Sequence, residues 1–513
     1  MLAIKYVFCS QFYPVCKFIP RWILTMNKNK NLSRRNFLKR SSCLTLASAT
    51  AVNSLGVGSL LSASTALAAA DDYKALVFIF MAGGNDSFNM ISPKGAGNLR
   101  NNYQQGRQGL ALPAEDLHSL NLATPAKIYG GETFNDFGMH PACDHLAKLF
   151  NDQELSILCN IGNLTTPTTR AQYLAKEVSL PPQLFSHSDQ QRQFQSGPNS
   201  HFRFGWGGRM AELLGDYNAN GSVSPLISVS GLNSFQVTKN SVINPYVMGN
   251  DGAATLNNFN GSRESMVESA MNSIDGSAHL MVQKYRDIFS SARNAEDIVH
   301  SAFQQAAATG VDYDQVFTSA GAADSKIGRR LKTVAKMIAG RQSTGNNRPI
   351  FFVEMNGFDT HQKLLSEHHE LMTELSCALK GFRDVLKAQG DFDNVLSFAG
   401  SEFARTLTPN GNDDEAGTDH AWGGHALVMG GMINGGNFFG THPDLKVNQG
   451  LDASNGRGRW IPTTATTQAS AVIAHWFGVP QDDLPQLFPS LNNFASAFES
   501  EANLNFIKSG AAS

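Results

Sequence analysis

Short, continuous apolar runs recur along this chain and limit the folds that it can adopt. Each run is about as long as one strand and is rich in β-branched or aromatic residues; they lie at 75–81, 155–161, 225–229, 349–355, 394–399 and 426–429. Continuous apolar character is typical of strands buried on both faces of a mostly parallel sheet. Segments with a helical apolar period lie between several of the runs, at 206–214, 262–307, 324–340, 362–389 and 466–477. The sequence therefore predicts an α/β fold, a three-layer α/β/α sandwich around a mostly parallel sheet.

The first 70 residues have the features of an export signal. Residues 33–39, Ser-Arg-Arg-Asn-Phe-Leu-Lys, match a twin-arginine signal, and an Ala-, Ser- and Leu-rich stretch with a small-residue cleavage site follows. We therefore expect the twin-arginine translocase as a partner during export, and a periplasmic or secreted mature protein. Such a signal does not need the aromatic, cationic residues before Met26, so the true start is either Met1 or Met26.

Residues 71–513 are expected to form a single domain, with loop or helical insertions around 164–184 and 216–345. No segment after the signal is apolar over the length that a membrane span needs, so we expect no stable span after cleavage. The first 70 residues hold nine of the 41 Lys and Arg and none of the 43 Asp and Glu. The remaining chain is therefore acidic, which argues against a nucleic-acid partner.

Polar side chains follow three of the predicted strands at the points where these end. Asp86 follows the first strand, Asp359 and His361 follow the strand at 349–355, and Glu402 follows the strand at 394–399. The carboxyl ends of parallel strands share one edge of a sheet, where ligands bind in open α/β folds. Taken singly, Asp86 could instead cap a turn or helix, and Glu402 could be a first-turn helix acid.

A glycine-rich segment at 417–425, Gly-Thr-Asp-His-Ala-Trp-Gly-Gly-His, adds Asp419, His420 and His425. Aspartate and imidazole are ligands that suit Zn, Mn or Fe. Either Asp-His segment alone could simply cap a turn. Together with Asp359 and His361, however, the segment indicates a metal site at the rim of the sheet.

Four motifs, in order, carry a resemblance to a known family. They are Phe-Met-Ala-Gly-Gly-Asn-Asp-Ser-Phe-Asn at 80–89, Gly-Phe-Asp-Thr-His at 357–361, Ser-Glu-Phe-Ala-Arg-Thr at 401–406, and Gly-Thr-Asp-His at 417–420 followed by Gly-Gly. The chain resembles, from about residue 73 to 498, the twin-arginine-exported domain of unknown function family 1501. That family has no assigned reaction, and it looks like a branch of the alkaline phosphatase and sulfatase superfamily.

The superfamily resemblance implies an alkaline-phosphatase-like sandwich that holds two divalent metal ions, with Zn, Mn, Mg and Ca left open. It implies phosphoryl or sulfuryl transfer from a small anionic ester substrate through a nucleophile at a helix N-terminus. The positions that match metal ligands of the superfamily are Asp86, Asp359, His361, Asp419, His420 and His425, with Glu402 as a further candidate.

The nucleophile is assigned by the same resemblance. Relatives tend to carry Arg-Ser-His-Phe after the second strand, and Phe-Ser-His-Ser-Asp-Gln-Gln at 185–191 fits that order, which nominates Ser186. Phe185 stands where the arginine is usual, and Thr169 in the preceding insertion is the alternative nucleophile. No cysteine after residue 70 lies in the Cys-x-Pro-x-Arg setting of sulfatases, which argues against formylglycine. Arg405 could hold a substrate oxyanion, although an arginine near a helix start is usually a surface or ion-pair residue.

Two classes of function remain open on the sequence. The first is an exported metal-dependent hydrolase that acts on a phosphate or sulfate ester, or on another ester, through a serine nucleophile. The second is a catalytically degraded member of the family that acts as an exported binding or assembly protein, an alternative that the missing arginine before Ser186 supports.

Overall fold

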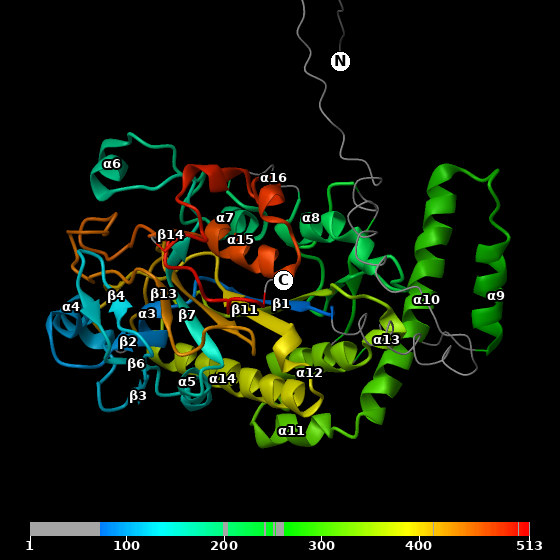
Figure 1. The fold of residues 1–513 in the computed structure, drawn as a ribbon, viewed down its shortest axis with the longest axis horizontal. Coiled ribbons are helices and arrows are strands. Elements are labelled where there is room, and N and C mark those ends of the chain that lie inside the picture. Colours follow the sequence, from blue (N-terminus) through cyan, green and yellow to red (C-terminus); the bar gives the residue numbers. More distant parts are fainter. Residues whose placement is uncertain are drawn as a thin grey trace, which may run out of the picture. The chain divides into compact units, whose positions relative to one another are not determined.

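A nine-stranded sheet is the centre of the computed structural model, which describes residues 72–198, 204–240, 243–249, 252, 261–413, 415–500 and 502–511 (Figure 1). The strand order is β13-β7-β12-β11-β1-β10-β8-β9, and β14 also pairs with β7. The strands are β1 (Ala75–Ala82), β7 (Leu155–Gly162), β8 (Leu226–Ser228), β9 (Tyr246–Val247), β10 (Ile350–Asn356), β11 (Val395–Gly400), β12 (Gly424–Met429), β13 (Phe438–Gly440) and β14 (Thr464–Ala465).

All pairings in this sheet are parallel except the two that β12 makes, with β11 and with β7. The predicted mostly parallel sheet is confirmed, and the run at 426–429 is its one reversed strand. The carboxyl ends of β1, β7, β10 and β11 therefore share an edge with the amino end of β12. Every loop that carries a predicted metal ligand leaves or enters the sheet at this edge.

Side chains of β1 alternate between two hydrophobic cores, as the pleat of a strand requires. Val77 and Ile79 belong to a core with helices α5 (Asp144–Asn151), α12 (Lys326–Ala339) and α14 (Leu364–Ala388). Phe78 and Phe80 belong to the opposite core, with α7 (His187–Ser196), α8 (Trp206–Leu213), α15 (Thr466–Phe477) and α16 (Leu484–Leu487). Figure 1 shows these two helix layers on either side of the sheet, so the predicted α/β/α layering is confirmed.

The remaining elements lie in the insertions and around the site. The predicted helical segment at 262–307 is two helices, α9 (Gly261–Asn272) and α10 (Leu280–Ala308), with a break between them. The other helices are α3 (Ser87–Met90), α4 (Asn98–Arg107), α6 (Arg170–Ala175), α11 (Tyr313–Ser319) and α13 (Arg341–Thr344). Two small sheets are built from β2 (Ile91–Pro93), β3 (His118–Ser119) and β6 (Phe137–Met139), and from β4 (Ala126–Lys127) and β5 (Thr133–Phe134).

No helix within the described ranges has the length and apolarity to cross a membrane. The predicted export signal at 1–70 lies outside the described residues, so its boundary stays a prediction.

Candidate metal centre

Four segments that are distant in sequence bring their side chains together at this edge of the sheet. β10 ends at Asn356, and the turn at Gly357 leads to Asp359 and His361. The loop before β12 carries His420, and His187 is the first residue of α7. The loop after β11 contributes residues that support this group from behind.

Nε2 of His420 and Oδ1 of Asp359 each lie close to the Nε2 atoms of both His187 and His361. The Nε2 atom of His420 lies 2.9 Å from Nε2 of His187 and 2.9 Å from Nε2 of His361. Oδ1 of Asp359 lies 3.3 Å from Nε2 of His187 and 3.1 Å from Nε2 of both other histidines. Metal ligands at bond lengths of about 2.0–2.2 Å are roughly 3.3 Å apart in a tetrahedral site, so this spacing suits ligands of one cation. His187, Asp359 and His420 make a possible metal site.

The outer nitrogen of each imidazole faces an acceptor, which fixes how the ring is protonated. Nδ1–H of His187 donates to Oε1 of Glu402 at 2.8 Å, and Nδ1–H of His420 donates to the carbonyl oxygen of Phe185 at 2.7 Å. Nδ1 of His361 faces Oδ1 of Asp419 at 3.5 Å. With Nδ1 protonated in this way, each neutral ring turns the lone pair of Nε2 toward the shared centre. Acceptors behind metal-binding histidines play this part in zinc sites.

Glu402 supports His187 from a fully buried position. Its Oε1 also accepts hydrogen bonds from the backbone N–H of Gly83 at 2.9 Å and from the amide of Gln191 at 3.1 Å. The hydrogen bond from His187 to Glu402 raises the pKa of His187. The structure thus places Glu402 behind His187, where it orients the ring.

Arg405 performs the matching task for Asp359. Its fully buried guanidinium donates to Oδ1 of Asp359 at 2.6 Å, to the carbonyl of Gly83 at 3.3 Å, and to Thr418. Burial raises the pKa of Asp359, but the hydrogen bond and charge of Arg405, together with His187 and His361, lower it by more, and the net pKa is lowered. Because these partners occupy the guanidinium, the geometry favours Arg405 as a positioning residue for Asp359 over a holder of substrate.

Asp419 lies in the same layer, behind His361. Its Oδ2 accepts from the guanidinium of Arg457 in an ion pair. Burial raises the pKa of Asp419, but the charge and hydrogen bond of Arg457, together with Asn410 and His361, lower it by more, and the net pKa is lowered.

Ser186 lies at the N-cap of α7, directly before His187. Its Oγ–H donates to Oδ2 of Asp189 at 2.6 Å and does not cap the helix, so the first-turn backbone N–H groups are not used by this side chain. Phe185 before it adopts a left-handed φ of 72°. This conformation is rare for a bulky residue and marks a constrained turn, and it directs the Phe185 carbonyl to His420.

The alternative nucleophile, Thr169, has a structural task. Its side chain accepts a hydrogen bond from the backbone N–H of Gln172, and the Gln172 side chain accepts from the backbone N–H of Thr169. This reciprocal pair is a capping box that begins α6.

Two of the predicted ligands take partners outside the cluster. Asp86 is fully buried and forms an ion pair with Arg107 of α4, which is also fully buried. His425 is buried within β12; its Nδ1 accepts from the backbone N–H of Asn160 at 3.2 Å, and burial holds its pKa well below the usual value. Within the described residues neither side chain forms a hydrogen bond or an ion pair with the cluster.

His187 is the cluster member that the sequence did not single out as a ligand. It follows the proposed nucleophile in the Phe-Ser-His-Ser-Asp-Gln-Gln segment at 185–191, so the signal was present in the pattern. The resemblance assigns the reactive role to Ser186, and only the fold places His187 beside Asp359.

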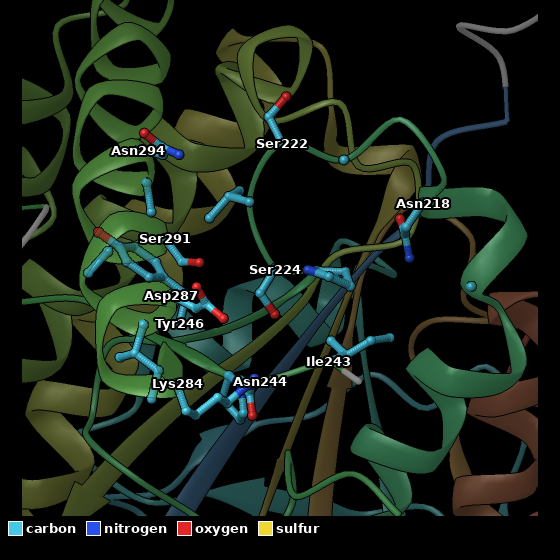
Figure 2. A pocket seen from close by; sticks show the side chains of 18 residues that line it. Asn218, Ser222, Ser224, Ile243, Asn244, Tyr246, Lys284, Asp287, Ser291 and Asn294 are labelled. Carbon is cyan, nitrogen blue, oxygen red and sulfur yellow. The ribbon is translucent and has the colours of Figure 1, made fainter. Parts of the chain in front are cut away.

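A pocket lies away from the cluster, between α10 and the segments at 215–225 and 243–246. Figure 2 shows Asp287 and Ser291 of α10 facing Ser224 across it. The residues that line it include one acidic residue, Asp287, and no histidine or cysteine. It does not offer a metal site of the kind described above.

The fold and the site define a class: a mixed α/β protein with a cluster of histidine and aspartate at the rim of a mostly parallel sheet. Comparison with family models assigns the chain more closely: residues 73–455 match the family described as protein of unknown function DUF1501. The chain belongs to this family, as its motifs predicted.

Two further comparisons give little beyond the family. A search of curated proteins returned no match. Among solved structures, a mutant of alkaline phosphatase PafA is similar with 13% sequence identity and a TM-score of 0.21, over 65% of this chain and 63% of that chain. The chain thus spans less than two thirds of that protein, and so low a score supports no shared function.

Proposed function

We propose that this chain is an exported metal-dependent hydrolase that cleaves a phosphate or sulfate ester. The observation that carries the proposal is the convergence of three Nε2 lone pairs and one carboxylate oxygen, each nitrogen set by an acceptor behind it. Without a cation, lone pairs and a negative charge this close together would repel one another. The ordered resemblance of the motifs to the alkaline phosphatase and sulfatase superfamily supports the same class of reaction.

His187, His361 and His420 would hold the metal through Nε2, and Asp359 would hold it through Oδ1. Three imidazoles and one carboxylate suit Zn, Mn or Fe, whereas Ca and Mg favour all-oxygen sites. Since Asp86 and His425 have partners elsewhere, we propose one ion at this cluster. When bound, a divalent metal supplies a Lewis acid that stabilises negative charge on the transferred group.

Ser186 is the proposed nucleophile. Its Oγ–H already points to the carboxylate of Asp189, which is placed to take the proton as Oγ bonds to phosphorus or sulfur and the ester oxygen leaves. The first-turn N–H groups of α7 follow it in the chain and can donate to the oxygens of the transferred group. Water would then release the product from Ser186.

The second candidate function is that of an exported binding protein with a degraded site. Two observations favour it: Arg107 neutralises Asp86, the position that matches the first-strand metal aspartate of the superfamily, and Phe185 replaces the usual arginine. A binding protein would keep the metal and lack turnover.

A screen with aryl phosphates and aryl sulfates separates the two functions. We expect natively exported protein to contain metal and to hydrolyse at least one ester. Ser186→Ala should abolish turnover and retain the metal, and Ser188→Ala, two residues along the same helix, is the matched control that should remain active. Bound metal with no turnover on any ester would replace the hydrolase with the binding protein.

Export through the twin-arginine translocase is tested separately. Replacing Arg34 and Arg35 by lysine should leave the protein unprocessed inside the cell, because the paired arginines are the address that the translocase reads. Normal processing of that variant would contradict the proposed route.

A further inference from the structure

Two arginines lie beside the cluster with donors that the protein leaves unused. Arg457 and Arg459 come from the segment before β14, which is folded around the buried carboxylate of Asp452. That carboxylate accepts from the backbone N–H groups of Asn448, Ser454 and Arg459 at 2.8, 2.9 and 3.1 Å. Asp452 is thus occupied in shaping the segment.

Arg459 forms no ion pair among the described residues. Its guanidinium lies over the ring of Phe185, 4.6 Å from the ring centre. Within the described part of the chain no acceptor receives a hydrogen bond from this guanidinium, and its buried Nε atom has no partner. Leaving a partly buried guanidinium unpaired costs free energy, which is a sign that a ligand supplies the acceptor.

Arg457 uses only part of its guanidinium in contacts with the described residues. Its Nη2 pairs with Asp419, while its Nε is buried and has no partner among the described residues. The acidic groups of the site are already matched, since Asp359 pairs with Arg405 and Glu402 accepts from His187. Arg459 is therefore not paired with these acidic groups.

Both arginines reach the cluster through a single intervening residue. Arg459 stacks on Phe185, whose carbonyl holds His420 at 2.7 Å. Arg457 pairs with Asp419, which faces His361 at 3.5 Å. A ligand that contacts these arginines therefore lies next to the residues that hold the outer nitrogens of His361 and His420.

We propose that Arg457 and Arg459 form a subsite that binds a tetrahedral oxyanion, phosphate or sulfate, next to the cluster. Guanidinium groups present parallel N–H donors that match two oxygens of such an anion at once, and the pair of arginines offers more than one such set. A catalytic role for this subsite rests on the proposed function, because there the two arginines would bind the anionic group of the ester substrate. The binding of the anion itself needs no turnover.

The test is titration of the full chain with inorganic phosphate and with inorganic sulfate, followed by calorimetry. It is done on protein as purified and after chelation, so that anion bound by a metal is separated from anion bound by arginine. We expect Arg459→Met and Arg457→Met to weaken binding by about tenfold or more in the chelated protein. Arg263→Met, which removes an exposed arginine from α9, should leave the affinity unchanged.

The outcomes separate this inference from the proposed function. Wild-type affinity in both arginine variants, or no binding by the chelated wild type, would overturn the subsite even if the protein proves to be a hydrolase. Lost binding in a folded variant supports the subsite even if no ester is cleaved. Should Arg459→Met not fold, Arg459→Lys decides: it keeps the charge but loses the paired donors, so weaker binding supports the subsite and unchanged binding overturns it.

Discussion

Replacing Glu402 by glutamine tests whether the residues behind the histidines tune the site. The glutamine amide has the shape of the carboxylate, so its oxygen can still accept from Gly83, Gln191 and His187, and its nitrogen can face Ser401. What changes is the charge on the acceptor of His187 Nδ1–H. The hydrogen bond of 2.8 Å is charge-assisted in the native protein and becomes a neutral one.

The expected loss follows from that change. Hydrogen bonds to charged groups contribute about 1.5–3 kcal/mol and neutral ones about 0.5–1.5 kcal/mol, so the exchange removes roughly 1–1.5 kcal/mol from the support of His187. Loss of an outer-shell partner typically lowers metal affinity by about 10–100-fold, or roughly 1.4–2.7 kcal/mol. We therefore expect Glu402→Gln to bind Zn about tenfold more weakly.

Competition with a chelating dye at several pH values measures this affinity. In the metal-free protein Glu402 raises the pKa of His187, so protons compete with the metal more strongly as the pH falls. In the glutamine variant the onset of that competition should move to lower pH. Glu154→Gln, which alters a glutamate paired with Arg383 and Lys387, is the control. Equal Zn affinity of Glu402→Gln and the native protein would refute the role of the outer acceptors.

Three other substitutions test separate parts of the structure. Burial lowers the pKa of His368 to about 3, so below about pH 6.5 the unfolded chain binds a proton at this residue that the folded chain does not bind. His368 alone should lower the unfolding free energy by about 2 kcal/mol between pH 6.5 and 5. The drop should be smaller by that amount in His368→Gln, as urea titrations at both pH values will measure. Equal drops would contradict this. Gly83→Ala should destabilise the fold by about 1–3 kcal/mol and weaken metal binding, because Gly83 has a φ of 122° and a Cβ there would lie 2.4 Å from the backbone nitrogen of Asp359; unaltered metal content would count against the close approach. Thr169→Ala should cost about 1 kcal/mol at the N-terminus of α6, seen as faster local amide exchange, and leave ester turnover unchanged; lost turnover would return Thr169 as the nucleophile.

The buried strands were the part of the fold that the sequence predicted best. β1, β7, β10 and β11 are long apolar runs, and their bounds differ from the predicted ones by at most a residue or two. The direction of β12 was not accessible, since the four apolar residues at 426–429 pair equally well in either sense. The short strands β13 and β14 have too few residues to give a period, and the pairing with β7 defines them.

The site was predicted in its location and in part of its membership. Asp359, His361 and His420 follow or precede strands at one edge, which is a rule of topology that sequence order can express. The partners of Asp86 and His425 could not be foreseen. Arg107 reaches Asp86 from a helix whose packing the sequence does not specify, and His425 is buried because it lies within β12, which is buried throughout.

Glu402 and Asp419 were predicted as ligands but support the histidines in the structure. The reason is again that the sequence does not specify tertiary contacts. Glu402 and Asp419 are carboxylates beside a metal motif, and by residue type alone they are as suitable as Asp359. Only the geometry places Glu402 against Nδ1 of His187 and Asp419 against Nδ1 of His361. Residue chemistry thus predicts that a site binds metal, and tertiary structure decides which atoms face the ion.

Metal stoichiometry and X-ray absorption of natively exported protein test the central claim most directly. The structure predicts one divalent ion for each chain, with a first shell dominated by imidazole nitrogen at about 2.0–2.1 Å. It also predicts that His420→Gln loses the ion, whereas His475→Gln, a histidine on α15 whose Nδ1 bonds the Val479 carbonyl, keeps it. Protein that is free of metal as exported, or an ion held without imidazole and retained in His420→Gln, would contradict the account.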